Sequence, residues 1–125
     1  MRKGNPLPAL LRAFFQEWLA EQRSASIHTI RSYRDTWRLL LRFVAERKGC
    51  GVARLTLTDV SAGEVRAFLH HTEHGRKTTI GTRNCRLAAI RSFFSFVADN
   101  NPEYIAQCSE VLAVPLKREP TSAPC

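Results

Sequence analysis

The sequence predicts an all-α domain: a compact bundle of four main helices followed by a short C-terminal helix. Apolar residues recur at steps of three and four in several long segments, and no segment of strand length alternates apolar with polar residues. Residues that favour turns and helix caps separate these segments. A chain of 125 residues with 44% hydrophobic content has the size of one ordinary domain with its own core.

The first two helices have the clearest pattern. A helix is expected from about Pro8 to Gln22, and its apolar residues lie at helical spacing: Leu7, Leu10, Leu11, Phe14, Phe15, Trp18 and Leu19. A long second helix is expected from about Ile27 to Lys48. Ser26 precedes it as a candidate N-cap, and Gly49 follows it as a stop.

A short third helix is expected to end at about Glu73. Asp59 and Ser61 are candidate caps before it, and Gly75 follows its end. Its inward positions are Val65, Phe68 and Leu69.

A long fourth helix is expected from about Thr79 to Asp99. Its apolar arc is broad, which predicts packing against several neighbours, and consists of Leu87, Ala89, Ile90, Phe93, Phe94, Phe96 and Val97. Pro102 is well placed to begin a fifth, shorter helix through about Leu112. Residues 1–114 are therefore expected to form one helical domain, and residues 115–125 a polar, proline-rich tail.

Positive charge is concentrated in the middle of the chain. The formal net charge is +8, and residues 23–91 hold fourteen Lys and Arg residues against five Asp and Glu residues. Arginine outnumbers lysine by 15 to 4, which favours planar, bidentate recognition of phosphate or guanine. The alternative is a surface that is basic without binding a specific polyanion, because net charge indicates how a protein associates and does not determine its fold.

The second helix carries four arginines along one side: Arg31, Arg34, Arg38 and Arg42. At 100° per residue they share an arc of about 80°, and the apolar residues of the helix are centred about 120° away. The arginines span about 16 Å, a length suited to a DNA groove. Since Asp35 and Glu46 are the only acidic residues in this helix, ion pairs within the helix can neutralise few of the four arginines.

The start of the fourth helix is also rich in hydrogen-bond donors. A helix N-terminus presents free backbone N–H groups and a partial positive charge. Polar and basic residues surround this one: Lys77, Thr78, Thr79, Thr82, Arg83, Asn84 and Arg86. The pattern predicts an end that projects beyond the core and contacts phosphates and base edges. The alternative is an ordinary solvated helix start, because Thr and Asn are common near caps.

The sequence gives little support for a metal site, a cofactor site or a membrane segment. The four cysteines contain no Cys-x-x-Cys pair, and His70 with His74 is an isolated helical pair without a carboxylate or cysteine at matching spacing. No metal, cofactor or small-molecule substrate is therefore predicted. The sequence also lacks a long apolar run and a secretory signal, so a cytoplasmic protein without membrane contact is expected.

The two basic segments resemble those of a known family, the N-terminal core-binding domain of tyrosine recombinases, or phage integrases. "SIHTIRSYRDTWRLLLRFV" resembles that family's second helix through Ser26, Thr29, Tyr33, Arg34 and Phe43. "TRNCRLAAIRSFFSFV" resembles its fourth helix through Thr82, Arg83, Asn84, Arg86, Leu87, Ile90, Arg91 and Phe94. The similarity extends from about residue 7 to residue 118.

The resemblance implies a SAM-like helical bundle that clamps duplex DNA through its second and fourth helices, for DNA integration and recombination. In such recombinases a separate C-terminal domain supplies the nucleophilic tyrosine. The resemblance therefore implies that this chain lacks the catalytic domain and is not itself an enzyme. The implied partners are double-stranded DNA and, on DNA, other recombinase protomers, with the protein associated with the nucleoid when bound.

The residues expected to contact DNA fall into two groups. Contacts that position the DNA backbone are assigned to Arg31, Arg34, Arg38, Lys77, Arg91 and the start of the fourth helix at Thr79. Contacts to bases are assigned to His28, Thr29, Ser32, Thr82, Arg83 and Arg86. No residue is assigned a catalytic role.

Two other functions are compatible with a small helical domain. A protein-interaction module that docks on a full-length recombinase and modulates it would expose an apolar patch made of Tyr104, Ile105, Val111 and Leu112. A helix-turn-helix repressor fits less well, because no short helix, tight turn and recognition helix follow one another at the usual spacing.

Overall fold

The computed structural model describes residues 5–75 and 79–118, and all regular structure in these ranges is helical, as predicted. The first helix has two parts, α1 (Leu7–Arg12) and η1 (Ala13–Gln22). The predicted α-helix becomes a π-helix in η1, where the N–H of the residue that ends it, Arg23, donates to Trp18 O at 2.8 Å, five residues back. The wider turn stacks Phe14 on Trp18, with ring centroids 5.4 Å apart.

Helix α2 (Ile27–Lys48) has the predicted bounds and caps. The Ser26 hydroxyl accepts a hydrogen bond from the Thr29 N–H at 3.1 Å, which satisfies one of the free amides of the first turn. Gly49 ends the helix with φ +70°, a left-handed conformation that favours glycine because it has no Cβ.

Two single turns, η2 (Val52–Arg54) and η3 (Leu57–Asp59), lead into helix α3 (Ala62–Gly75). Of the two predicted caps, Ser61 serves α3 by accepting from the Glu64 N–H at 3.3 Å. Asp59 instead accepts from the Thr56 N–H at 2.8 Å and so caps η3.

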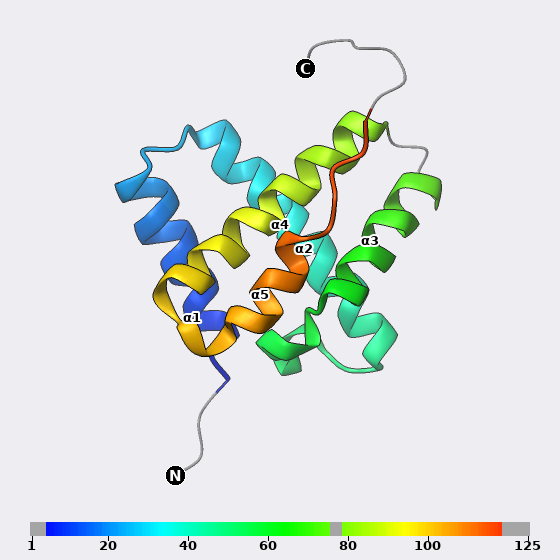
Figure 1. The fold of residues 1–125 in the computed structure, drawn as a ribbon, viewed down its shortest axis with the longest axis horizontal. Coiled ribbons are helices and arrows are strands. Elements are labelled where there is room, and N and C mark those ends of the chain that lie inside the picture. Colours follow the sequence, from blue (N-terminus) through cyan, green and yellow to red (C-terminus); the bar gives the residue numbers. More distant parts are fainter. Residues whose placement is uncertain (1–4, 76–78, 119–125) are drawn as a thin grey trace.

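Helix α4 (Ile80–Asn100) is the central element, and it packs against α2, α3 and the last helix. In Figure 1 it crosses the middle of the molecule, with α1 and η1 on one side and α3 on the other. The chain then turns through η4 (Pro102–Tyr104) into α5 (Ile105–Leu112), close to the predicted bounds. None of the helices in the described ranges combines the length and the apolarity needed to cross a membrane.

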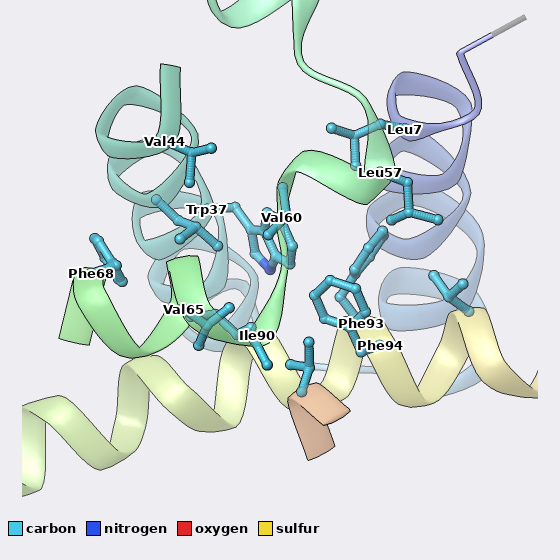
Figure 2. Packing of buried hydrophobic residues seen from close by; sticks show 14 of the residues in the cluster. Leu7, Trp37, Val44, Leu57, Val60, Val65, Phe68, Ile90, Phe93 and Phe94 are labelled. Atoms are coloured by element: carbon cyan, nitrogen blue, oxygen red, sulfur yellow. The ribbon is translucent and has the colours of Figure 1, made fainter. Parts of the chain in front are cut away.

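The core lies where α2, α3 and α4 meet, and Figure 2 shows their apolar side chains converging there. Trp37 and Phe93 pack edge to face with ring centroids 4.6 Å apart, a geometry worth about 0.5 to 1.5 kcal/mol beyond burial. Phe93 and Phe94 have no exposed surface. The predicted inward residues of α3 are likewise buried. The packing of Trp37 against Phe93 fixes α2 relative to α4, and with it the arrangement of the starts of these two helices.

After α5 the chain runs back along the bundle. Val114 is buried, and residues 115–118 lie exposed along the surface beside α4, near its first turn (Figure 1). This part of the predicted polar tail is therefore placed against the helices rather than projecting from them. We refer to Pro115–Arg118 as the C-terminal segment.

Candidate nucleic-acid interface

The arginine stripe of α2 is exposed along its full length. Arg31, Arg34, Arg38 and Arg42 are all exposed, whereas Trp37, Leu40 and Val44 of the same helix are buried, as the spacing predicted. Within the described part of the chain, the stripe has one ion pair, between Arg38 and Asp35 at 3.9 Å. Both of these side chains are more than half exposed, so water and salt screen the ion pair. The pair therefore offsets little of the positive charge of the stripe.

Hollows lie on both sides of this stripe. On one side is an open groove of about 450 Å³ with an apolar floor, lined by Leu11, Phe15, Arg34, Trp37, Arg38, Leu41, Arg42 and Val52. On the other side is a polar cleft of about 390 Å³ between the first halves of α2 and α4, lined by His28, Arg31, Ser32, Asp35, Thr36, Leu39, Thr82, Cys85 and Arg86. We call the second hollow the α2–α4 cleft.

The α2–α4 cleft brings together five residues that the sequence analysis had assigned to DNA contacts. His28, Arg31 and Ser32 come from α2, and Thr82 and Arg86 come from α4. The arginine side chains carry fixed positive charge and fork-shaped donors, and the hydroxyls both donate and accept. These groups suit phosphate oxygens and base edges, whereas Asp35 is the one carboxylate among the lining residues.

The helix starts that border the cleft are built alike. In α2 the Ser26 hydroxyl accepts from the Thr29 N–H, and in α4 the Thr79 hydroxyl accepts from the Thr82 N–H, each at 3.1 Å. Both helices begin at the upper edge of Figure 1, so the positive ends of the two helix dipoles lie on the same side of the bundle. This arrangement adds to the attraction of the cleft for anions.

Arg83, which the sequence predicts to contact a base, does not line the α2–α4 cleft. Arg83 as a whole is only 8% exposed. Its guanidinium donates to Pro115 O and to Asn84 Oδ1, both at 3.2 Å, and lies 3.7 Å from the carboxylate of Glu73. The prediction that Arg83 contacts a base is not supported, because the side chain faces α3 and the C-terminal segment. Arg83 directly follows Thr82 in the sequence, and one step along the helix corresponds to a rotation of about 100°.

The remaining assigned residues are distributed as follows. Arg91 is half-buried on the other side of α4, in a hollow shared with Leu112 and Leu116, so it does not join the cleft. Thr29 is half-buried and belongs to the cap of α2, and Thr79 is exposed at the cap of α4. Lys77 lies outside the described residues.

Arg34 and Arg38 line the apolar groove as well as forming the stripe. The Arg34 guanidinium carbon lies 5.9 Å from the ring centroid of Phe15, a cation–π contact that holds it against η1. Arg47, farther along α2, makes a bidentate pair with Glu64 at 2.9 and 3.1 Å, and this hydrogen bonding raises the pKa of Arg47. Arg47 therefore joins α2 to α3 rather than adding to the stripe.

Sequence reasoning missed four lining residues of the cleft: Asp35, Thr36, Leu39 and Cys85. Helical spacing could have found Cys85, since Thr82, Cys85 and Arg86 stand at positions i, i+3 and i+4 on one side of α4. Thr36 and Leu39 were harder to identify, because they border the core and the cleft at once.

Two other predictions concern side chains outside the cleft. The predicted apolar patch near the C-terminus does not form as a whole, because Val111 is fully buried, whereas Ile105 is 52% exposed and Tyr104 and Leu112 are half-buried. The His70 and His74 rings lie 4.3 Å apart. Among the described residues, no group of three or more potential metal ligands is found.

Comparison with known proteins identifies a family. The family model described as phage integrase, N-terminal SAM-like domain, matches residues 12–101, a range that includes η1, α2, α3 and α4. Two putative integrases/recombinases of Sinorhizobium fredii (strain NBRC 101917 / NGR234), y4rC and y4rD, are 44% and 43% identical over 118 and 112 residues. Tyrosine recombinase XerC of Rhodospirillum centenum (strain ATCC 51521 / SW) is 32% identical over 107 residues.

These matches cover most of this chain but a minor part of each relative. They include 94%, 90% and 86% of the chain, and 36%, 40% and 31% of y4rC, y4rD and XerC, respectively. No solved structure matches the chain. The similarity therefore applies to one domain of much longer proteins.

Proposed function

Since the chain belongs to the phage integrase family through its N-terminal SAM-like domain, we propose that it is a DNA-binding module for site-specific recombination. It would clamp duplex DNA through α2 and α4. The relatives that it resembles are named integrases, recombinases and a tyrosine recombinase, which supports DNA as the partner. The arginine-rich composition and the exposed stripe on α2 are consistent with that partner.

The observation that carries the proposal is the α2–α4 cleft. Residues chosen from sequence spacing on two separate helices line one polar hollow with cations on both walls. We assign contacts with bases to His28, Ser32, Thr82 and Arg86, which lie within the cleft. Contacts with the DNA backbone are assigned to Arg31, Arg34 and Arg38 on the stripe and to the start of α4 at Thr79.

We propose no catalytic step for this chain. The nucleophile and the groups that stabilise the reacting phosphate are proposed to belong to the part of the longer relatives that the chain does not cover. Clamping would orient the duplex, and a bound duplex could also bring several recombinase protomers together. The module is proposed to extend over residues 1–114, and residues 115–125 are proposed to form the polar tail that follows it.

The direct test is fluorescence anisotropy of the purified chain with a labelled duplex, titrated with salt between about 50 and 200 mM. The logarithm of the binding constant should fall linearly with the logarithm of salt concentration, with a slope of about −0.9 per phosphate contacted. An Arg38→Ala variant should weaken binding to all duplexes alike and reduce the magnitude of the slope by about 1. Absence of binding at low salt would contradict the proposal.

A further inference from the structure

The amide side chain of Asn84 holds the backbone of the C-terminal segment at one residue. Asn84 Nδ2 donates to Lys117 O at 2.8 Å, and the Lys117 N–H donates to Asn84 Oδ1 at 2.9 Å. The side chain thus pairs with both backbone groups of a single residue, as a neighbouring strand would. This pairing specifies the position and the direction of the segment, not only its proximity.

Two neighbours of Asn84 add further contacts to the same segment. Arg83 donates to Pro115 O at 3.2 Å, and Glu73 accepts from Lys117 Nζ at 2.9 Å. Glu73 also lies 3.7 Å from Arg83, so the carboxylate connects the two cations. We call Glu73, Arg83 and Asn84 the Asn84 cluster.

Hydrophobic burial does not explain why the segment lies where it does. Val114 is the last buried residue, and the four residues of the C-terminal segment are all exposed, with Leu116 at 52%. No side chain of the segment is fully buried, and only Leu116 is partly covered, in its hollow beside Leu112, so the polar contacts with the Asn84 cluster are the main contacts that fix the path of the segment. Loss of these contacts should release the segment without removing any part of the core.

Two members of the Asn84 cluster, Arg83 and Asn84, lie on the same stretch of α4 as residues that line the α2–α4 cleft. Thr82, Cys85 and Arg86 face the cleft, whereas Arg83 and Asn84, which lie between them in sequence, face the segment. Figure 1 shows the segment approaching this end of α4. A ligand on either side of this stretch therefore acts on the same few backbone dihedrals near the helix start.

We propose that Asn84 is a positioning residue that fixes the path of the chain leaving the bundle, and that DNA in the cleft and the docked segment stabilise each other. This rests on the proposed DNA-binding function. DNA contacts at Thr82 and Arg86 order the first two turns of α4, so the segment loses less entropy when it docks there. By thermodynamic reciprocity, the docked segment must strengthen DNA binding by the same factor.

The test is hydrogen exchange of the Lys117 amide in the whole chain, with and without a duplex. In the free protein, Asn84→Ala should accelerate this exchange by about tenfold, because the amide loses its acceptor. Duplex DNA should slow the exchange in the unsubstituted protein by about fivefold, and Asn84→Ala should weaken duplex binding by a similar factor. Trypsin cleavage after Lys117 gives a second measure of the freed segment.

A matched control is Asn100→Ala, which removes an exposed asparagine at the other end of α4 that donates to Phe96 O at 2.9 Å. It should leave both the Lys117 exchange and DNA affinity unchanged. Asn84→Asp keeps the acceptor for the Lys117 N–H but loses the donor to Lys117 O. The exchange rate of the Lys117 amide in Asn84→Asp should lie between the rates in Asn84→Ala and in the unsubstituted protein.

The outcomes separate the two proposals. Equal Lys117 exchange in the free Asn84→Ala, Asn84→Asp and unsubstituted proteins would overturn the positioning role. Duplex binding without any effect on Lys117 exchange would overturn the coupling and leave the DNA-binding function standing. Failure of the unsubstituted chain to bind any duplex would overturn the proposed function and the coupling with it, whereas the free-protein comparison would still decide the positioning role.

Discussion

The guanidinium of Arg83 lies 3.7 Å from the carboxylate of Glu73, and the two side chains are only 9% and 12% exposed. The ion pair joins the start of α4 to the last turns of α3. Because both charges are largely removed from water, each depends on the other and on nearby hydrogen bonds for stabilisation. Arg83 is therefore part of the structure that supports the start of α4 beside the α2–α4 cleft, and its guanidinium is engaged by Glu73, Asn84 and Pro115.

Arg83→Ala should lower the free energy of unfolding by about 1 to 3 kcal/mol, because it removes hydrogen-bond donors from a largely buried site. Urea denaturation with unchanged slope would measure the loss. Arg66→Ala, an exposed position on α3, should stay within about 0.5 kcal/mol of the unsubstituted protein. An unaltered denaturation midpoint together with weakened binding to one preferred sequence would instead restore Arg83 as a base contact.

Arg86 and Arg91 form a matched pair, since both are half-buried arginines on α4 but only Arg86 lines the cleft. Arg86→Ala should weaken binding to a preferred duplex by about 1 to 3 kcal/mol, the usual cost of losing a base contact. Arg91→Ala should change affinity by less than about 0.5 kcal/mol. Anisotropy titrations of both variants at one salt concentration would measure the difference, and equal losses would argue against the cleft as the binding site.

The arginine stripe of α2 could be predicted because its cause is local. Helical periodicity alone separates the exposed Arg31 and Arg38 from the buried Trp37, and the cap at Ser26 follows from residue type and position. The same holds for the inward face of α3. Such features need no knowledge of which helices are neighbours in space.

The role of Arg83 could not be predicted, because its partners are distant in sequence. Glu73 lies on another helix, and Pro115 lies 32 positions away. Spacing within α4 shows that Arg83 and Thr82 point in different directions, but it does not show which direction faces the cleft. The π-helical winding of η1 is a further case, since its apolar pattern fits an α-helix as well.

Cys85 offers a natural probe of the cleft, because it is exposed and lines the hollow between Thr82 and Arg86. Duplex DNA should slow alkylation of the Cys85 thiol by at least severalfold, since the bound backbone would block access. Cys50, half-buried near the end of α2, should react at the same rate with and without DNA. The experiment is best done in a Cys125→Ser background, and equal rates at Cys85 in the two conditions would place the DNA elsewhere.

Acid should release the C-terminal segment through Glu73. The hydrogen bond from Lys117, with the charges of Lys117, His74 and Arg83, lowers the pKa of Glu73 below its ordinary value. A carboxyl group whose pKa is lower in the folded state stabilises the fold at pH values above its unfolded pKa. That contribution is lost as the pH falls through the folded pKa, which lies below the ordinary value of a glutamate carboxyl group.

Trypsin is inactive at such low pH, so hydrogen exchange of the Lys117 amide between about pH 3 and pH 6 is the suitable measurement, corrected for the intrinsic pH dependence of exchange. Protection of Lys117 should decrease as Glu73 becomes protonated. In Glu73→Gln the side chain cannot ionise, so protection should be lower at pH 6 and vary less with pH. If protection in the unsubstituted protein and in Glu73→Gln followed the same pH dependence, the contact between Lys117 Nζ and Glu73 would not contribute to docking, and Asn84 and Arg83 would hold the segment alone.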